Sequence, residues 1–316
     1  MRRLTILVIV AACLYSLYWF VGASRIESGA KDALVQMQAD GWDISHTDLA
    51  TRGYPSRFDT TATDLKVAAP DGSWGYSAPF AQAFALSYRP TNVIVALADD
   101  QRLQIADQVI DITSNRMRAS GSVSAGANLP LKEATFEAEA MALSSNYGWQ
   151  LDVEDALFAL RPSPNEDQTY DLYLGAAKVL PSQGAALLDV KFDSTIQLDR
   201  ALDRHLSAGA SPQIEAIDVK ALQVDLGGLQ LTGAGRLTVD GAGIPFGEIT
   251  FNTPDWQKLV PVLSEAGIMP PQFQIMAMTL LQSFAAADGS LSLPLRFENG
   301  AMQLGPIPLG PAPRLR

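Results

Sequence analysis

The sequence predicts a mainly β fold, a β-rich α+β protein with helices at its start and near its end. Three observations support this class. Short runs in which apolar and polar residues alternate recur from Trp42 onwards, as in half-buried strands. A charge-free apolar run opens the chain. Helical spacing of apolar residues returns most clearly between Thr253 and Ala287.

Residues 1–23 are predicted to form a transmembrane signal-anchor. Arg2 and Arg3 precede about 19 residues, Leu4–Gly22, none of which is charged. A helix of that length spans about 28 Å, close to the roughly 30 Å hydrocarbon core of a bilayer. The positive-inside rule places the two arginines in the cytoplasm. We therefore expect a single-pass protein of the inner (cytoplasmic) membrane, with its N-terminus in the cytoplasm and its body in the periplasm.

A cleavable signal peptide is the alternative, because Val21-Gly22-Ala23 offers small residues where a peptidase needs them. Cleavable apolar regions are usually shorter, about 7–15 residues. This run also ends in the aromatic residues Tyr18, Trp19 and Phe20, which favour the membrane–water interface. Both observations favour a retained anchor, and both alternatives export the body.

The composition describes a folded and acidic body. The chain has 316 residues, 47% of them hydrophobic, and a formal net charge of −11. Nucleic acid is therefore excluded as an expected partner, because binding it depends on cationic neutralisation of phosphates. The single cysteine, Cys13, lies inside the apolar run. The body consequently has no disulfide and no cysteine-based site.

Residues 24–40 are predicted to continue as a stalk helix that packs on the first strands. Ile26, Ala30 and Leu34 fall on one helical stripe, and Gly41 is expected to end the helix. The exported residues 24–316 are then expected to form one β-rich periplasmic domain.

The strands that follow are expected to be connected as meanders. Pro-, Gly- and Ser-rich loops are predicted at residues 161–167 and 207–213, and one or two helical turns at 199–206. Gly233-Ala234-Gly235 is interpreted as a turn between two consecutive strands. The predicted strands are 43–49, 61–68, 83–88, 92–98, 102–105, 109–112, 118–125, 134–143, 147–153, 155–160, 169–177, 187–198, 214–225, 228–234, 235–239, 246–252, 290–297 and 301–304.

A helical hairpin is predicted at about residues 255–287. Thr253 or Asp255 can cap its first helix, and Gly267 with Pro270-Pro271 is expected to end that helix. The second helix, Phe273–Ala286, is apolar on nearly all sides.

The strands return after this hairpin. Asn299-Gly300 predicts a two-residue β-turn, and residues 305–316 an extended tail. The whole pattern predicts a large curved antiparallel β-sheet or sandwich, with the helical hairpin inserted before the last strands.

Three stretches resemble an uncharacterised bacterial family: Gly53-Tyr54-Pro55-Ser56-Arg57-Phe58-Asp59, residues 288–300 and residues 304–313. The family is the domain of unknown function DUF2125, typical of alphaproteobacteria, and the resemblance covers nearly the whole chain. It implies an inner-membrane-anchored envelope protein and supplies no catalytic residues. More distantly, the chain is similar to AsmA-like proteins. That similarity implies an open β-groove of the kind thought to pass lipids between envelope membranes.

The residues form no recognisable catalytic set. His46 and His205 stand in unlike contexts, and no nucleophile elbow, P-loop, dinucleotide-binding or zinc-protease motif is present. The carboxylate pairs are expected at solvated strand ends and loops; they are Asp99-Asp100, Glu154-Asp155 and Glu166-Asp167. We therefore expect no enzyme, no cofactor and no metal.

Seven residues are candidates for a ligand groove. An arginine that interrupts an apolar strand can bind a lipid phosphate, and the alternative is an outward-facing or ion-paired arginine. A Met-rich helix can line an adaptable apolar groove, and the alternative is a buried core helix. The candidates are Arg57, Phe58, Val95, Met276, Met278, Leu281 and Arg296.

The sequence leaves three functions open. The first is a non-catalytic, membrane-anchored structural or interaction module of the envelope, with an envelope protein as partner. The second is binding or transfer of a phospholipid or another hydrophobic ligand along a curved β-sheet groove. The third is a hydrolase, which the missing catalytic set disfavours.

Overall fold

The computed structural model describes residues 1–164, 166–208, 211–265, 272, 274–305 and 307–315. The chain divides into two compact units. Unit 1 comprises Met1–Ser122 with Leu143–Gly148, and unit 2 comprises Val123–Ala142 with Trp149–Arg316. Antiparallel strands dominate both units, which confirms the predicted fold class.

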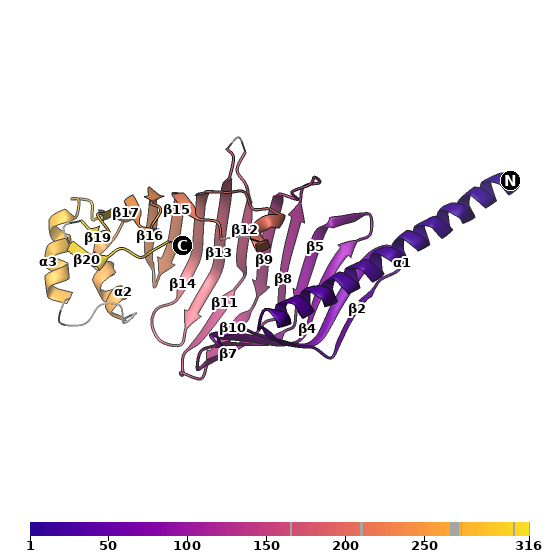
Figure 1. Ribbon diagram of the computed structural model, residues 1–316. Helices are drawn as coiled ribbons and strands as arrows, with labels where there is room; N and C mark the ends of the chain where they lie inside the picture. Colours follow the sequence, from indigo (N-terminus) through magenta and orange to yellow (C-terminus); the bar gives the residue numbers. More distant parts are fainter. Residues whose placement is uncertain (165, 209–210, 266–271, 273, 306, 316) are drawn as a thin grey trace. The chain divides into compact units, whose positions relative to one another are not determined.

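Unit 1 begins with one continuous helix, α1 (Arg2–Ala39), drawn in indigo in Figure 1. It joins the predicted anchor to the predicted stalk, and it is long and apolar enough to cross a membrane. The helix ends as predicted. Gly41 follows it with a φ of +94°, the left-handed conformation that glycine adopts most easily after a helix. As expected, α1 packs on the first strands of the unit.

The sheet of unit 1 forks because its two longest strands change partner along their length. β3 bonds β2 through Asp59–Thr63 and β1 through Lys66–Ala68. Along its other edge β3 bonds β4, which in turn bonds β6 through Trp74–Ser77 and β5 through Ala81–Leu86. β5 continues to β8, and β6 continues to β7 and β10. The strands are β1 (Asp43–Ser45), β2 (Asp48–Arg52), β3 (Arg57–Ala68), β4 (Trp74–Leu86), β5 (Arg89–Leu97), β6 (Asp100–Ile105), β7 (Gln108–Thr113), β8 (Arg116–Val123) and β10 (Met141–Ser145), whose residues from Leu143 onwards belong to unit 1.

The sheet of unit 2 is a long antiparallel meander. β12 pairs with β9 and β13, β11 pairs with the end of β13, and from β13 to β20 each strand pairs with the next. The strands are β9 (Leu131–Glu139), β11 (Gln150–Glu154), β12 (Ala156–Pro162), β13 (Thr169–Pro181), β14 (Leu187–Leu198), β15 (Ile214–Leu226), β16 (Leu229–Val239), β17 (Pro245–Thr253), β18 (Leu291–Glu298), β19 (Ala301–Leu304) and β20 (Ile307–Pro311).

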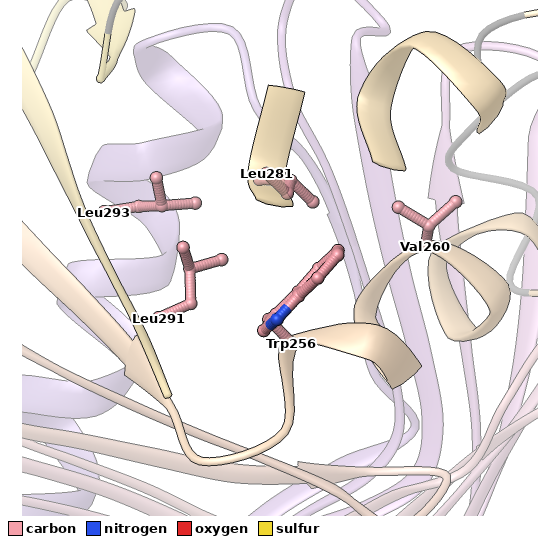
Figure 2. Close-up of a cluster of buried hydrophobic side chains, with 5 residues drawn as sticks. All are labelled: Trp256, Val260, Leu281, Leu291 and Leu293. Atoms are coloured by element: carbon pink, nitrogen blue, oxygen red, sulfur yellow. The ribbon is translucent and has the colours of Figure 1, made fainter. Parts of the chain in front are cut away.

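The predicted helical hairpin is present in unit 2. A single 3-10 turn, η2 (Trp256–Lys258), leads into α2 (Leu259–Glu265), and α3 (Gln274–Phe284) returns. Figure 2 shows the buried cluster that holds the helices to β18, formed by Trp256, Val260, Leu281, Leu291 and Leu293. The predicted helix stop at Gly267 and Pro270-Pro271, and the start at Phe273, lie outside the described residues.

Three local predictions are corrected. Gly233-Ala234-Gly235 is not a turn but lies inside β16. A glycine is needed at position 235 because any side chain there would collide with the Glu248 carbonyl of β17. The predicted strand 134–143 is two strands, separated at Ala140, whose φ is +47°. The predicted tail is extended, as expected, but part of it pairs with β19 as β20.

Other local predictions are confirmed. Asn299 and Gly300 form the hairpin turn with φ values of +53° and +74°. Strand 187–198 is found with the predicted bounds. The helical turn expected at 199–206 is found later in the chain, as the 3-10 turn η1 (Arg204–Ala208).

Candidate functional site

One face of the unit 2 sheet is apolar across eight strands, from β9 and β12 to β18. Partners directly across an antiparallel ladder place their side chains on the same face, so the strand register defines rows. We call the following three rows the apolar face. The first is Ala134, Leu160, Leu172, Ser194, Val219, Gly235, Ile249 and Leu295; the second is Phe136, Phe158, Leu174, Phe192, Leu222, Gly233, Phe251 and Leu293; the third is Pro162, Tyr170, Ile196, Ile217, Leu237, Gly247 and Phe297.

The opposite face of the same sheet is polar. Between the apolar rows run rows of charged and hydroxyl side chains, such as Arg161, Asp171, Thr195 and Asp218. We call this side the polar face. The sheet of unit 2 is therefore amphipathic across its width, with charge on one side and hydrocarbon on the other.

Asp171 is the centre of the ion pairs on the polar face. Its carboxylate accepts hydrogen bonds from Lys220 Nζ at 2.9 Å and Thr195 Oγ1 at 3.2 Å, and Arg161 Nε lies 3.6 Å away. The bond from Lys220, above all, holds the pKa of Asp171 below its ordinary value. Cross-strand pairing of this kind joins β12, β13, β14 and β15 on the polar side.

The two ends of the apolar face are covered, and several residues between them are also buried: Ser194 is 0%, Val219 4% and Leu237 5% exposed. The α2–α3 hairpin packs on Leu293, and Val262 of α2 packs with Leu226 and Leu229 at the β15–β16 turn. At the other end the Leu202 N–H donates to Tyr170 Oη at 2.7 Å, which holds the segment before η1 beside the third row. Leu174, in the second row, remains 39% exposed.

A second constellation lies in unit 1, where α1 meets the sheet. Trp19 and Ala23 of α1 are buried against Phe58 of β3. The Trp19 ring stacks on Phe58 with centroids 5.8 Å apart, and its Nε1 donates to the Arg57 carbonyl at 2.8 Å. A Cβ at Gly22 would come within 2.9 Å of Phe58 Cζ. We call this contact, with the turns beside it, the anchor junction.

The anchor junction also holds the β4–β5 turn. Ser87 is fully buried, and its carbonyl accepts a 2.6 Å hydrogen bond from the Tyr18 hydroxyl. Its Oγ lies 2.8 Å from the Tyr15 hydroxyl and donates to the Pro55 carbonyl at 3.3 Å. Side chains of α1 thus tie the β2–β3 turn and the β4–β5 turn together.

The structure divides the seven predicted groove residues between the units. In unit 1, Arg57 and Phe58 belong to the anchor junction, and Val95 is half-buried on β5. Arg57 also pairs with Asp59, with 2.8 Å between Nη2 and Oδ2.

In unit 2, Leu281 is buried in the hairpin cluster and Met278 packs beside it. Met276 is 62% exposed. Arg296 lies on the polar face, where its Nε donates to Glu248 Oε2 at 2.7 Å, so it is ion-paired and does not point to the apolar rows.

Sequence reasoning missed the apolar face as a unit. Alternation was visible in each strand, but the rows depend on register and on which strands are neighbours. It also missed Ser87 and Gly22. The only signal for Gly22 was a small residue among aromatic ones.

The histidines and carboxylate pairs are not assembled into a site. His46 and His205 are both exposed, and so are Asp99-Asp100, Glu154-Asp155 and Glu166-Asp167. Within the part of the chain that the structure describes, no three His, Cys, Asp or Glu residues are grouped to hold a metal ion.

Comparison with known proteins identifies a family. The family model described as "Uncharacterized protein conserved in bacteria (DUF2125)" matches residues 19–313. No curated protein and no solved structure matches the chain. The distant similarity to AsmA-like proteins stays a prediction.

Proposed function

The chain belongs to the DUF2125 family of uncharacterised bacterial proteins, and from this premise we propose that it is a membrane-anchored protein that binds the acyl chains of a lipid on the apolar face of unit 2. The role is non-catalytic, the anchor lies in the inner membrane, and the body lies in the periplasm.

The continuous apolar face is the observation that carries the proposal. At about 4.8 Å between strands, the first two rows are about 34 Å long and the third, which crosses seven strands, is about 29 Å long, so the three rows span on the order of 450 Å². Part of this area is buried, since Val219 and Leu237 are only 4% and 5% exposed, whereas Leu174 at 39% marks an accessible part. Exposed apolar patches on soluble proteins often mark binding sites. The rows contain no charged side chain, so they suit hydrocarbon better than a headgroup.

Retention of the anchor is supported by the anchor junction. Cleavage after Ala23 would remove Trp19 and Ala23, the two residues that bury Phe58. The family match also includes these positions, since it begins at residue 19. Arg2 and Arg3 at the start of α1 support a cytoplasmic N-terminus.

The test is native mass spectrometry of the full chain purified from membranes, with two matched leucine variants. Leu174→Asp places a charge on the apolar face, at a position that is 39% exposed. Leu157→Asp places the same charge on the polar face of the neighbouring strand, at a position that is 36% exposed. We expect near-stoichiometric phospholipid on the wild-type chain and on Leu157→Asp, and a loss of most of it on Leu174→Asp.

Lipid-free wild-type protein, or equal lipid on both variants, would overturn lipid binding at this face. A protein partner that co-purifies with the wild-type chain and with Leu157→Asp, but not with Leu174→Asp, would instead support the second candidate, the interaction module. In that case the apolar face would be a protein interface.

A further inference from the structure

The anchor junction lies inside the apolar run of α1 and not beyond it. Contacts between α1 and the sheet reach back to Tyr15, which bonds Ser87. The segment Leu4–Leu14 before it has 11 residues and spans only about 16 Å, roughly half of a 30 Å hydrocarbon core. A helix that crosses the bilayer with this run must therefore carry residues Tyr15–Gly22 through the outer half.

We infer that the β2–β3 turn and the β4–β5 turn are immersed in the periplasmic leaflet of the membrane beside α1. The inference rests on the membrane anchoring proposed above. Its partner is the lipid surface itself, because the turns are fixed to the part of α1 that must lie there.

The exposed side chains of the turns suit that position. Tyr54 is 52% exposed and Tyr88 is 65% exposed, and the exposed Phe20 stacks on Tyr54 with centroids 5.4 Å apart. Pro55 and Pro90 beside them are exposed and have no N–H to donate. Amphipathic aromatic rings of this kind are enriched at membrane interfaces.

Part of the turn backbone is hydrogen-bonded within the protein, which lipid favours for an immersed segment. The Arg57 N–H donates to the Gly53 carbonyl and the Ser87 N–H to the Ser56 carbonyl, both at 3.0 Å. Three carbonyls of the turns accept hydrogen bonds from side chains. Trp19 donates to the Arg57 carbonyl, Tyr18 to the Ser87 carbonyl and Ser87 to the Pro55 carbonyl.

Exposed arginines surround the turns. Arg52 ends β2, Arg57 begins β3 and Arg89 begins β5; all three are exposed, and Arg57 is ion-paired with Asp59. Long arginine side chains can extend from an immersed backbone to the phosphate level. This charge contrasts with the acidic chain as a whole, whose formal net charge is −11.

The opposite end of the same strands provides a control. Pro70, at the β3–β4 turn, lies against Gly41, just beyond the end of α1. Gly41 is 23 residues after Tyr18, or about 35 Å along the helix direction. The β3–β4 turn is therefore expected in water.

The experiment uses single-cysteine variants of the full chain in a Cys13→Ser background. Tyr88→Cys and Pro90→Cys report on the β4–β5 turn, and Ser73→Cys reports on the β3–β4 turn. Each is labelled with an environment-sensitive fluorophore and reconstituted in vesicles of phosphatidylcholine and phosphatidylglycerol. Quenching by acyl-chain spin labels and by aqueous iodide is then measured.

We expect labels at residues 88 and 90 to be quenched at least several-fold more by the spin labels than the label at residue 73, and to be protected from iodide. Iodide quenching of residues 88 and 90 as strong as that of residue 73 would overturn the inference. So would recovery of the chain outside the membrane fraction.

Native mass spectrometry on the same samples separates this inference from lipid binding by unit 2. Membrane-buried labels on a chain without bound lipid would support the immersed turns and overturn the proposed lipid binding. Iodide-accessible labels on a chain with bound lipid would overturn the immersed turns and support the proposed lipid binding.

Discussion

Single residues decide how α1 meets the sheet. Phe58 is 3% exposed and is held between the ring of Trp19 and the backbone of α1 at Gly22. The sequence predicted that the anchor ends in aromatic residues, because this prediction depends only on which residues are present. It could not predict that Gly22 is the point of closest approach, because that depends on which strand the helix packs against.

Gly22→Leu tests this contact, with Gly29→Leu as its control on the same helix. No atom lies within 4 Å of a Cβ at Gly29. Overpacking typically costs about 1–3 kcal/mol, so we expect Gly22→Leu to loosen the anchor junction. Hydrogen exchange of residues 54–58 should rise in Gly22→Leu and stay unchanged in Gly29→Leu. Equal exchange in both variants would contradict the packing described.

Asp171 gives a pH-dependent prediction. Its pKa is lowered in the folded chain, chiefly by the hydrogen bond from Lys220. The carboxylate therefore stabilises the fold above its ordinary pKa, near 4, and this stability is lost as the pH falls through the lowered value. Denaturant unfolding between about pH 5 and pH 2 should show a shallower loss of stability for Asp171→Asn than for wild type. Parallel curves would show that the pairing contributes nothing.

At the scale of elements, the predictions that succeeded had a local cause. Asn299-Gly300 needs only two residues with positive φ, and the hairpin of helices needs only an apolar segment interrupted by prolines. Gly233 and Gly235 misled because a glycine inside a strand looks the same in sequence as a glycine in a turn. The reason for Gly235 is the neighbouring backbone of β17, which the sequence of β16 does not contain.

The stability of the α2–α3 hairpin should depend on the side chains that it buries and not on those that it exposes. Leu281 lies in the cluster of Figure 2, whereas Met276, on the same helix, is 62% exposed. Leu281→Ala should cost about 2–5 kcal/mol in the unfolding free energy of the hairpin region, and Met276→Ala less than about 0.5 kcal/mol. Urea unfolding followed by hydrogen exchange would measure both. Similar losses would mean that α3 packs through another face.

At the scale of the whole molecule, the fold class and the apolar helix at the N-terminus could be predicted, and the candidate site mostly could not. Of the predicted groove residues, none lies in the three rows of the apolar face. A row such as Leu160, Leu172 and Val219 depends on the register of every successive strand pair, and a shift of register by one residue would move a residue to the other face. Hydrophobic alternation specifies that a strand has an apolar side, but not what that side adjoins.

Retention of α1 is a prediction for the whole chain. Intact-mass measurement of the protein from membranes should give a chain that includes Trp19 and Ala23, because both fill the anchor junction. A mature chain that begins at Ser24 would contradict the anchor. It would also leave Phe58 without its cover.

The last strand, β20, has a consequence for self-association. A sheet ends in a row of free backbone donors and acceptors, on which another copy of the chain can add a strand. β20 pairs with β19 and carries Pro308 and Pro311, which have no N–H. The prolines therefore remove donors from this edge of the sheet, and β20 is a poor template for the addition of a strand from another copy of the chain.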